Sequence, residues 1–195
     1  MQPKMIIKRN IMKKLLSLFA VLFLACIGSA QTMEECKPFA FLENVEKLNV
    51  VFNYEEADFD GHSFAEFINL LKKDDYRTWD MVEKEWRVKF LREINDVLTK
   101  DNVKVFVNGE DCDNTFLIKL KIIDAKGTLA CVCKVLDNQG EYIGVHKDYY
   151  MIRGGVIGDT VNLIGDGHER LGTELGRFVS LMRNRIRYYK QKGKM

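Results

Sequence analysis

The sequence is poor in the residues that usually separate domains. Its 195 residues include only two prolines, and Ser/Gly-rich linkers, low-complexity runs and internal repeats are absent. Domain boundaries usually fall in exposed stretches rich in Pro, Gly or polar residues. We therefore expect residues 31–195 to form a single domain, with a basic C-terminal tail that begins at about residue 183.

The spacings that mark common catalytic and metal sites are also missing. The three histidines, His62, His146 and His168, do not form an H-E-x-x-H motif, and no G-x-S-x-G nucleophile elbow occurs. Cys131 and Cys133 are separated by one residue, so the C-x-x-C spacing of redox and zinc sites is absent. The sequence therefore predicts a protein that is not an enzyme, with no catalytic residues, metal ligands or cofactor.

A glycine-rich stretch, "GGVIGDTVNLIGDGHERLGTELGRF", begins at Gly154. It lacks both the G-K-[ST] of a phosphate-binding loop and the G-x-G-x-x-G of a dinucleotide fold. We interpret residues 165–167 as a turn that enters a helix over about 168–189, with Asp166 as its cap. A weaker interpretation makes this stretch a ligand or partner region, formed by Gly154, Gly155, Gly158, Asp166 and His168.

Two further glycines, Gly172 and Gly176, lie four residues apart and therefore on one face of the same helix. Each costs about 1 kcal/mol relative to alanine inside a helix. Close packing of the helix against the sheet would offset this cost, and it predicts that Gly176→Leu destabilises the fold. His168, next to Glu169, is the strongest acid–base candidate, although a surface or capping role is the simpler interpretation.

Long hydrophobic runs are limited to one stretch near the beginning. Residues 12–30, "MKKLLSLFAVLFLACIGSA", join two lysines, an apolar run and small residues. That layout is typical of a secretory signal peptide. Its apolar run is too short for a membrane-spanning helix, which needs about 20 apolar residues. We expect cleavage after Ala30, with lipidation of Cys26 as the alternative, and either Met1 or Met12 as the start. The protein would then be exported to the periplasm or envelope of a Gram-negative bacterium.

Positive charge is not in excess once this segment is removed. The chain has 30 Lys and Arg against 28 Asp and Glu, and five of the basic residues lie in 1–30. The remaining 25 basic and 28 acidic residues give a net charge of about −3, which gives no support to nucleic-acid binding. The basic tail "RNRIRYYKQKGKM" reads as a solvated helix end, with membrane contact through this tail or through lipidated Cys26 as the alternative.

Hydrophobic periodicity predicts an α+β domain with the order β-α-α-β-β-β-β-α. Apolar residues alternate over 47–54, and a Ser63–Glu66 capping box starts a helix that is followed by a second over about 78–99. Strands separated by short turns then follow, among them "TFLIKLKIID", in which Ile122 shares a face with Phe116. We expect a mostly antiparallel sheet with the helices packed on one face.

Four cysteines remain after residue 30. Cys131 and Cys133 point to the same face of a strand, which suggests buried thiols. Their spacing of about 6.5 Å is near the upper limit for a disulfide. Pairing of Cys36 with Cys112 is a further possibility, and the sequence leaves the disulfide pattern open.

Three segments carry a resemblance to known proteins: "LNVVFNYEEADFDGHSFAEF", "FLIKLKIIDAKGTLACVCKVLD" and "GGVIGDTVNLIGDGHERLGTELGRFV". Together they resemble exported proteins of unknown function from Bacteroides-type bacteria. More distantly, the layout is similar to small envelope α/β domains related to the curli-secretion lipoprotein. The resemblance implies an envelope protein that binds partners or builds assemblies.

The sequence therefore favours an exported, non-enzymatic interaction or assembly module that binds protein partners or itself. The alternative is a secreted hydrolase or small-ligand binder whose site lies at the glycine-rich turn near His168. Neither the ligand or partner nor the oligomeric state can be named from the sequence.

Overall fold

The computed structural model describes residues 33–74, 77–109, 112 and 114–195. The chain divides into two compact units, a larger one over 41–183 and a smaller one whose described residues are 33–40 and 184–195. The expected signal peptide, residues 1–30 with Cys26, lies outside the described residues.

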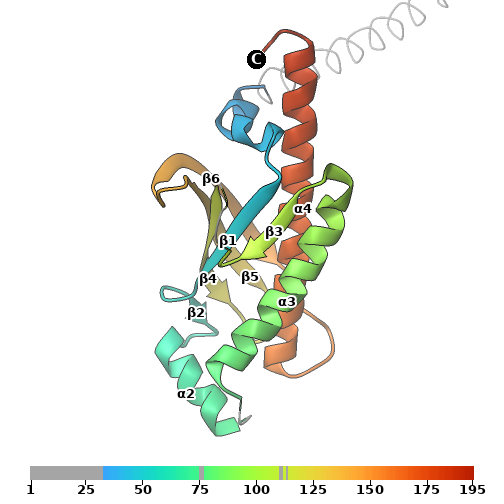
Figure 1. Cartoon of the computed structure of the whole chain (residues 1–195). Coiled ribbons are helices and arrows are strands. Elements are labelled where there is room, and N and C mark those ends of the chain that lie inside the picture. The colour runs from blue at the N-terminus through green and yellow to red at the C-terminus, as the bar shows by residue number, and fades with distance from the viewer. Residues whose placement is uncertain (1–32, 75–76, 110–111, 113) are drawn as a thin grey trace, which may run out of the picture. The chain divides into compact units, whose positions relative to one another are not determined.

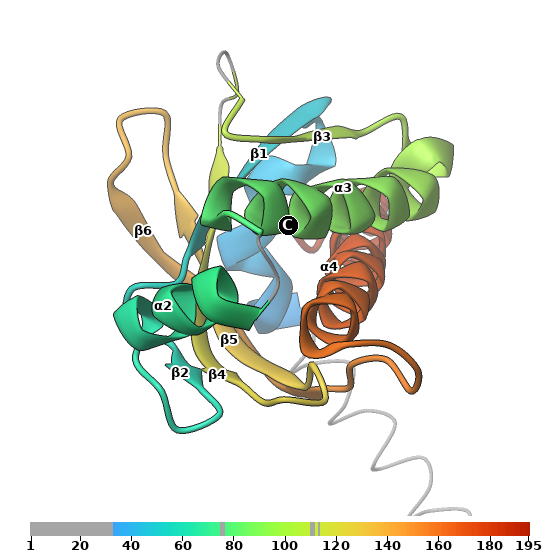
Figure 2. The same cartoon turned by 90° about the horizontal axis from the view of Figure 1, so that it is seen from below.

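The larger unit confirms the predicted α+β class, with a six-stranded sheet on which helices pack (Figures 1 and 2). The elements, two of which extend into the smaller unit, are η1 (Lys37–Glu43), β1 (Lys47–Asn53), β2 (Asp58–Phe59), α2 (Phe64–Asp74), α3 (Trp79–Leu98), η2 (Thr99–Asp101), β3 (Lys104–Val107), β4 (Thr115–Ile123), β5 (Leu129–Leu136), β6 (Tyr142–Ile152) and α4 (Thr160–Gln191). Both helix starts predicted near residues 63 and 78 are confirmed. The Ser63 amide donates to Glu66, and the Thr78 hydroxyl caps α3.

The sheet is mixed, with the strand order β3-β1-β4-β5-β6 and β2 paired to β4. The predicted antiparallel meander holds for β4, β5 and β6. β1 instead runs parallel to both of its neighbours, β3 and β4. Parallel neighbours need a crossover connection, and α2 and α3 supply it between β1 and β3. Short turns alone could not reveal this arrangement in the sequence.

One face of the sheet is buried and the other is half-exposed. Along β5, buried and half-buried residues alternate without interruption. β4 keeps this alternation only as far as Leu120, where a β-bulge shifts the register. The bulge turns Ile122 outward, 54% exposed, and buries Ile123. The prediction that Ile122 shares the buried face with Phe116 is therefore wrong, because one extra residue reverses which side chains point inward.

Helix α4 begins eight residues earlier than predicted. It starts at Thr160, so residues 165–167 lie inside the helix and do not form a turn. The cap is Asp159, whose carboxylate accepts from the Asn162 amide at 2.8 Å; the assignment of this role to Asp166 is wrong. Glycine inside a helix is tolerated only where close packing offsets its cost, and that packing cannot be seen in the sequence.

The glycines of α4 allow its backbone to approach α3. An ideal Cβ on Gly172 would lie 2.5 Å from the Phe90 carbonyl oxygen, and one on Gly176 would lie 3.0 Å from Cβ of Val97. The packing role predicted for these two glycines therefore has a definite partner. That partner is helix α3, and the expectation that they face the sheet is wrong. Gly167 is the glycine that meets the sheet side, where its Cβ would lie 2.2 Å from the Gly127 carbonyl oxygen.

The basic C-terminal segment is not wholly a solvated helix end. Arg183 is buried, and its guanidinium donates a hydrogen bond to the carbonyl oxygen of Val45 within the larger unit. In the smaller unit, α4 ends at Gln191, and Gly193 takes a left-handed φ of 63° while the Lys194 amide donates to the Tyr189 carbonyl. Glycine at such a position is a common helix stop.

We expect Gly172→Ala to lower the free energy of unfolding by about 2 kcal/mol, although alanine is the better helix former. The added methyl group would meet rigid backbone at Phe90. Urea denaturation monitored by circular dichroism measures the change.

Gly176→Ala is the matched control, because its Cβ would lie 3.0 Å from Cβ of Val97 and 3.4 Å from the nearest backbone atom, the Ile94 carbonyl oxygen. It should cost less than Gly172→Ala. An equal or higher stability for Gly172→Ala than for the unmodified chain would refute the close helix contact.

Candidate functional site

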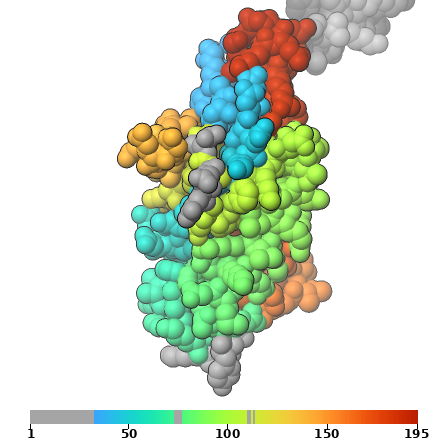
Figure 3. Space-filling view, viewed as in Figure 1, coloured from blue at the N-terminus to red at the C-terminus, as the bar shows by residue number. Residues whose placement is uncertain are grey.

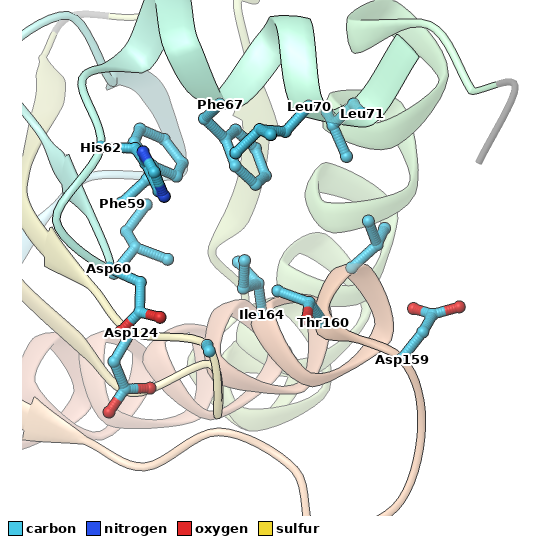
Figure 4. Close-up of a pocket in the computed structure, with 13 residues that line it drawn as sticks. Phe59, Asp60, His62, Phe67, Leu70, Leu71, Asp124, Asp159, Thr160 and Ile164 are labelled. Atoms are coloured by element: carbon cyan, nitrogen blue, oxygen red, sulfur yellow. The ribbon is translucent and has the colours of Figure 1, made fainter. Parts of the chain in front are cut away.

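A cavity opens in the larger unit between α2 and the start of α4 (Figure 4). It has a volume of about 370 Å³, within the range of small-ligand sites. We call it the α2–α4 pocket. Four segments line it, and their residues are Phe59, Asp60, His62, Phe67, Leu70, Leu71, Ile123, Asp124, Ala125, Asp159, Thr160, Val161 and Ile164.

The apolar wall of the pocket is held in place by aromatic packing. The rings of Phe59 and Phe67 stack with centroids 4.3 Å apart. Phe67 also stacks on Trp86, whose indole N–H donates to the Val161 carbonyl at 2.9 Å. This bond ties the first turn of α4 to α3, so the pocket has a fixed wall on the α4 side.

Two of the pocket carboxylates are engaged by their own backbone. Asp124 accepts from the amides of Lys126 and Thr128 and so closes the β4–β5 turn. Asp159 caps α4 and also pairs with Arg77 at 2.7 Å. The Asn162 amide, with a further contribution from Arg77, lowers the pKa of Asp159.

The third carboxylate, Asp60, lies in the turn after β2. Its backbone has a left-handed φ of 54°, and Gly61 follows with a φ of 87°. The turn is closed by the Gly61 amide, which donates to the Asp58 carboxylate at 2.6 Å. His62 follows and is exposed. Asp60 and His62 therefore add two further polar groups to the lining of the cavity (Figure 4).

His168 lies in the core and not at the surface. It is 0% exposed and packs between Phe52 and Trp86. Its Nδ1 lies 2.9 Å from the Ile164 carbonyl oxygen, and its Nε2 lies 3.0 Å from the Tyr54 hydroxyl. The Ile164 carbonyl can only accept, so Nδ1–H donates to it, and in the neutral ring Nε2 then accepts from the Tyr54 hydroxyl.

Burial lowers the pKa of His168 to about 4, with a smaller contribution from the positive charge of Lys89. Both ring nitrogens are already used, and His168 is not among the residues that line the pocket. The prediction of a surface or capping role is therefore wrong, and its ring cannot reach a substrate as a general acid or base. The His168 ring is buried because it packs against Phe52 of β1 and Trp86 of α3, which are far from it in the sequence.

The other residues of the proposed glycine-rich region also lie outside the pocket. Asp166 pairs with Lys89 at 2.8 Å. Gly155 lies against Asp166, since its ideal Cβ would fall 2.2 Å from the carboxylate, and Gly154 packs on the backbone of Lys126. Gly158 bends the loop with a φ of 138°. The structure thus brings Gly155 and Asp166 together for packing, while the pocket takes residues 159–161 and 164 from this stretch.

The two strand cysteines are buried thiols, as predicted. Cys131 and Cys133 are 2% and 1% exposed and are not bonded to another cysteine. Burial raises the pKa of Cys131 to about 12 and also raises that of Cys133. Thiols that stay protonated are poor nucleophiles and metal ligands. The pairing of Cys36 with Cys112 stays a prediction.

Within the described part of the chain, no group of three or more His, Cys, Asp or Glu residues is arranged to hold a metal ion. No described helix is long and apolar enough to cross a membrane. Sequence reasoning missed the pocket because its walls come from four separate segments. One feature of the sequence could have indicated it: Leu70 is an apolar residue outside the main apolar stripe of its helix. In the structure the Leu70 side chain lines the cavity and is 38% exposed.

A scan against protein-family models and searches of curated proteins and of solved structures find no match to this chain. The residues of the pocket therefore carry the functional argument.

The buried neutral state of His168 predicts that the protein loses stability as the pH falls. The folded pKa of about 4 lies below the ordinary histidine pKa of 6.5, so the unfolded chain binds a proton first. Between these two pH values the loss from His168 should be on the order of 3 kcal/mol. Urea denaturation at several pH values, compared with His168→Gln, measures this contribution.

If the free energy of unfolding depended on pH in the same way in the unmodified chain and in His168→Gln, the neutral buried state of His168 would be contradicted. NMR of the His168 ring gives a second test that needs no variant. Its ring signals should not titrate above about pH 5.

Proposed function

We propose that the protein is an exported, non-enzymatic binding module of the bacterial envelope, and that it holds an apolar group of its partner in the α2–α4 pocket. The observation that carries this proposal is the pocket itself, a cavity of about 370 Å³ with a mainly apolar lining. Pockets of this kind, with a few polar groups at fixed places, are typical of binding sites.

Two properties of the sequence support the export part of the proposal. Residues 12–30 have the layout of a signal peptide. Three segments between 48 and 179 resemble exported proteins of Bacteroides-type bacteria and, more distantly, envelope domains related to the curli-secretion lipoprotein. Both features favour the periplasm or envelope of a Gram-negative bacterium as the location.

Two of the three carboxylates of the pocket favour binding over catalysis. Asp124 holds a turn, and Asp159 holds a helix start and Arg77. Such groups are occupied by structural hydrogen bonds. The hydrolase alternative depended on His168, which is buried and hydrogen-bonded on both ring nitrogens. A partner side chain or a small apolar molecule fits the remaining surface.

A protein partner, or a second copy of the chain, is the occupant we favour. The pocket is near the lower end of the size range of ligand sites, which suits one large apolar side chain as an anchor. Burial of such a side chain contributes about 1.5–3 kcal/mol. A free small ligand of similar size is the second candidate, and the same cavity supports it.

An apolar probe should bind in the α2–α4 pocket. We expect N-phenyl-1-naphthylamine to fluoresce more strongly with the protein, and Leu70→Asp to reduce its affinity at least tenfold. Leu70 is 38% exposed at the cavity, so the variant should fold while it places a charge among apolar groups. Fluorescence titration measures both affinities.

Met81→Asp is the matched control. Met81 is 59% exposed on α3 and does not line the pocket, so this variant should bind the probe as the unmodified chain does. Equal loss in both variants, or no loss in Leu70→Asp, would count against the pocket as a binding site.

Export should leave a chain that begins at Gln31. Denaturing mass spectrometry of protein purified from an exporting bacterium should give the mass of residues 31–195, or a lipid-modified mass if Cys26 is used. Native spectra of the same sample should show the protein alone or as an oligomer. A small molecule lost on denaturation would favour the free-ligand candidate, and an unprocessed chain in the cytoplasm would refute export.

A further inference from the structure

The four most exposed large hydrophobic side chains of the described residues all lie within eight positions of one another. Tyr150 and Met151 are each 74% exposed, and Val156 and Ile157 are each 89% exposed. The next most exposed is Met81, at 59%. Scattered apolar residues are normal on a protein surface, but four strongly exposed ones in one short segment are unusual and point to a site of interaction.

The exposure of the first pair is built into the end of β6. Leu129 pairs with Ile152 and Cys131 pairs with Tyr149, so Tyr150 and Met151 together oppose a single residue of β5. This is a β-bulge, and Met151 has a left-handed φ of 57°. A residue other than glycine is unfavourable in that conformation. The backbone thus holds Met151 outward, in a conformation that glycine would adopt more easily.

The second pair sits at the tip of a braced loop between β6 and α4. The Gly155 amide donates to the Leu163 carbonyl at 3.3 Å, and Asp159 caps the following helix. Gly154 packs too closely on the backbone of Lys126 and Gly127 to accept a side chain. Figures 2 and 3 show this loop, in dark orange, protruding beside the beginning of α4. Val156 and Ile157 are therefore presented on a convex tip.

Positive charge lies next to Met151, at the first of these two pairs. One hollow of about 410 Å³ is lined by Met151, Ile152, Arg153, Arg170, Thr173, Glu174 and Arg177. Arg170 donates to the carbonyl oxygen of Arg153 at 3.3 Å, and Arg177 pairs with Glu174 at 2.9 Å. Among the described residues, Arg153 and Arg170 have no carboxylate partner.

We propose that this surface, which we call the β6–α4 edge (Tyr150, Met151, Arg153, Val156, Ile157, Arg170 and Arg177), docks on a bilayer that contains anionic phospholipid. The aliphatic tip would enter the interfacial region while the arginines contact phosphate groups. Apolar burial combined with basic residues is the usual basis of reversible attachment to a bilayer surface. This site is separate from the α2–α4 pocket and from the basic tail.

The shape of the edge favours a bilayer over an acidic protein. Val156 and Ile157 stand on a protruding tip, whereas the core of a protein interface needs a closely matching partner surface. A lipid interface adapts to a convex tip without such matching. The charges favour anionic lipid, because the hollow carries three arginines against one glutamate.

Co-sedimentation with vesicles tests the proposal, using chain purified from an exporting bacterium. The chain should bind vesicles of phosphatidylglycerol and phosphatidylethanolamine, and bind pure phosphatidylcholine much more weakly. The double change Val156→Ser/Ile157→Ser should weaken binding about tenfold or more. Arg153→Gln should weaken it about fivefold, with a reduced dependence on salt. All variants share one N-terminus and one tail, so differences between them report the edge.

Three variants serve as comparisons. Met81→Ser/Val88→Ser removes two exposed apolar side chains from α3 and should bind vesicles like the unmodified chain. Leu70→Asp, in the pocket, should also leave vesicle binding unchanged, which separates this proposal from the proposed function. Met151→Gly should raise the melting temperature while it weakens vesicle binding, a combination that a purely structural role does not give.

No sedimentation of the unmodified chain with anionic vesicles would overturn the proposal. So would vesicle binding that survives the changes at Val156, Ile157 and Arg153, because it would place the contact elsewhere. If the same changes reduced binding to polyglutamate while vesicles were ignored, the edge would be a site for an acidic protein, and the bilayer proposal would be wrong.

Discussion

The close approach of α4 to α3 is the contact on which the larger unit depends. At Gly172 the two helix backbones are so close that even one methyl group would meet the Phe90 carbonyl. At Gly167 the α4 backbone lies similarly close to the β4–β5 turn, at Gly127. The free-energy cost of several glycines inside one helix is offset by the dispersion contacts that such closeness allows.

This packing also explains the buried polar groups between the helices and the sheet. Because α4 lies so near, His168 falls among Phe52, Tyr54 and Trp86 and must be neutral. Tyr54 and the Ile164 carbonyl satisfy its two nitrogens. A buried histidine with both nitrogens satisfied costs little and fixes how the helix is turned. The residue that looked most like a catalyst thus serves to position α4.

The start of the same helix contributes to both surfaces to which we assign roles. Residues 159–161 border the α2–α4 pocket, while the loop before them carries the exposed aliphatic tip of the β6–α4 edge. The indole bond from Trp86 to Val161 holds this region to α3. The two proposals, an apolar anchor in the pocket and an anionic bilayer at the edge, therefore concern neighbouring parts of the chain.

Local patterns in the sequence were enough for the fold class, the α2 and α3 helix starts, the antiparallel hairpins and the burial of Cys131 and Cys133. Each depends on residues a few positions apart, whose alternation or spacing determines which side is buried. The sequence also carries the signal-peptide pattern, on which the export proposal depends.

Only the tertiary structure decided the parallel pairing of β1, the true start of α4 and the environment of His168. All three depend on segments far apart in the chain: a crossover through two helices, a helix partner that makes glycines favourable, and aromatic rings from β1 and α3. The pocket is of the same kind, because its walls come from four segments that no local pattern links. Long-range packing, and not local propensity, therefore placed the candidate site.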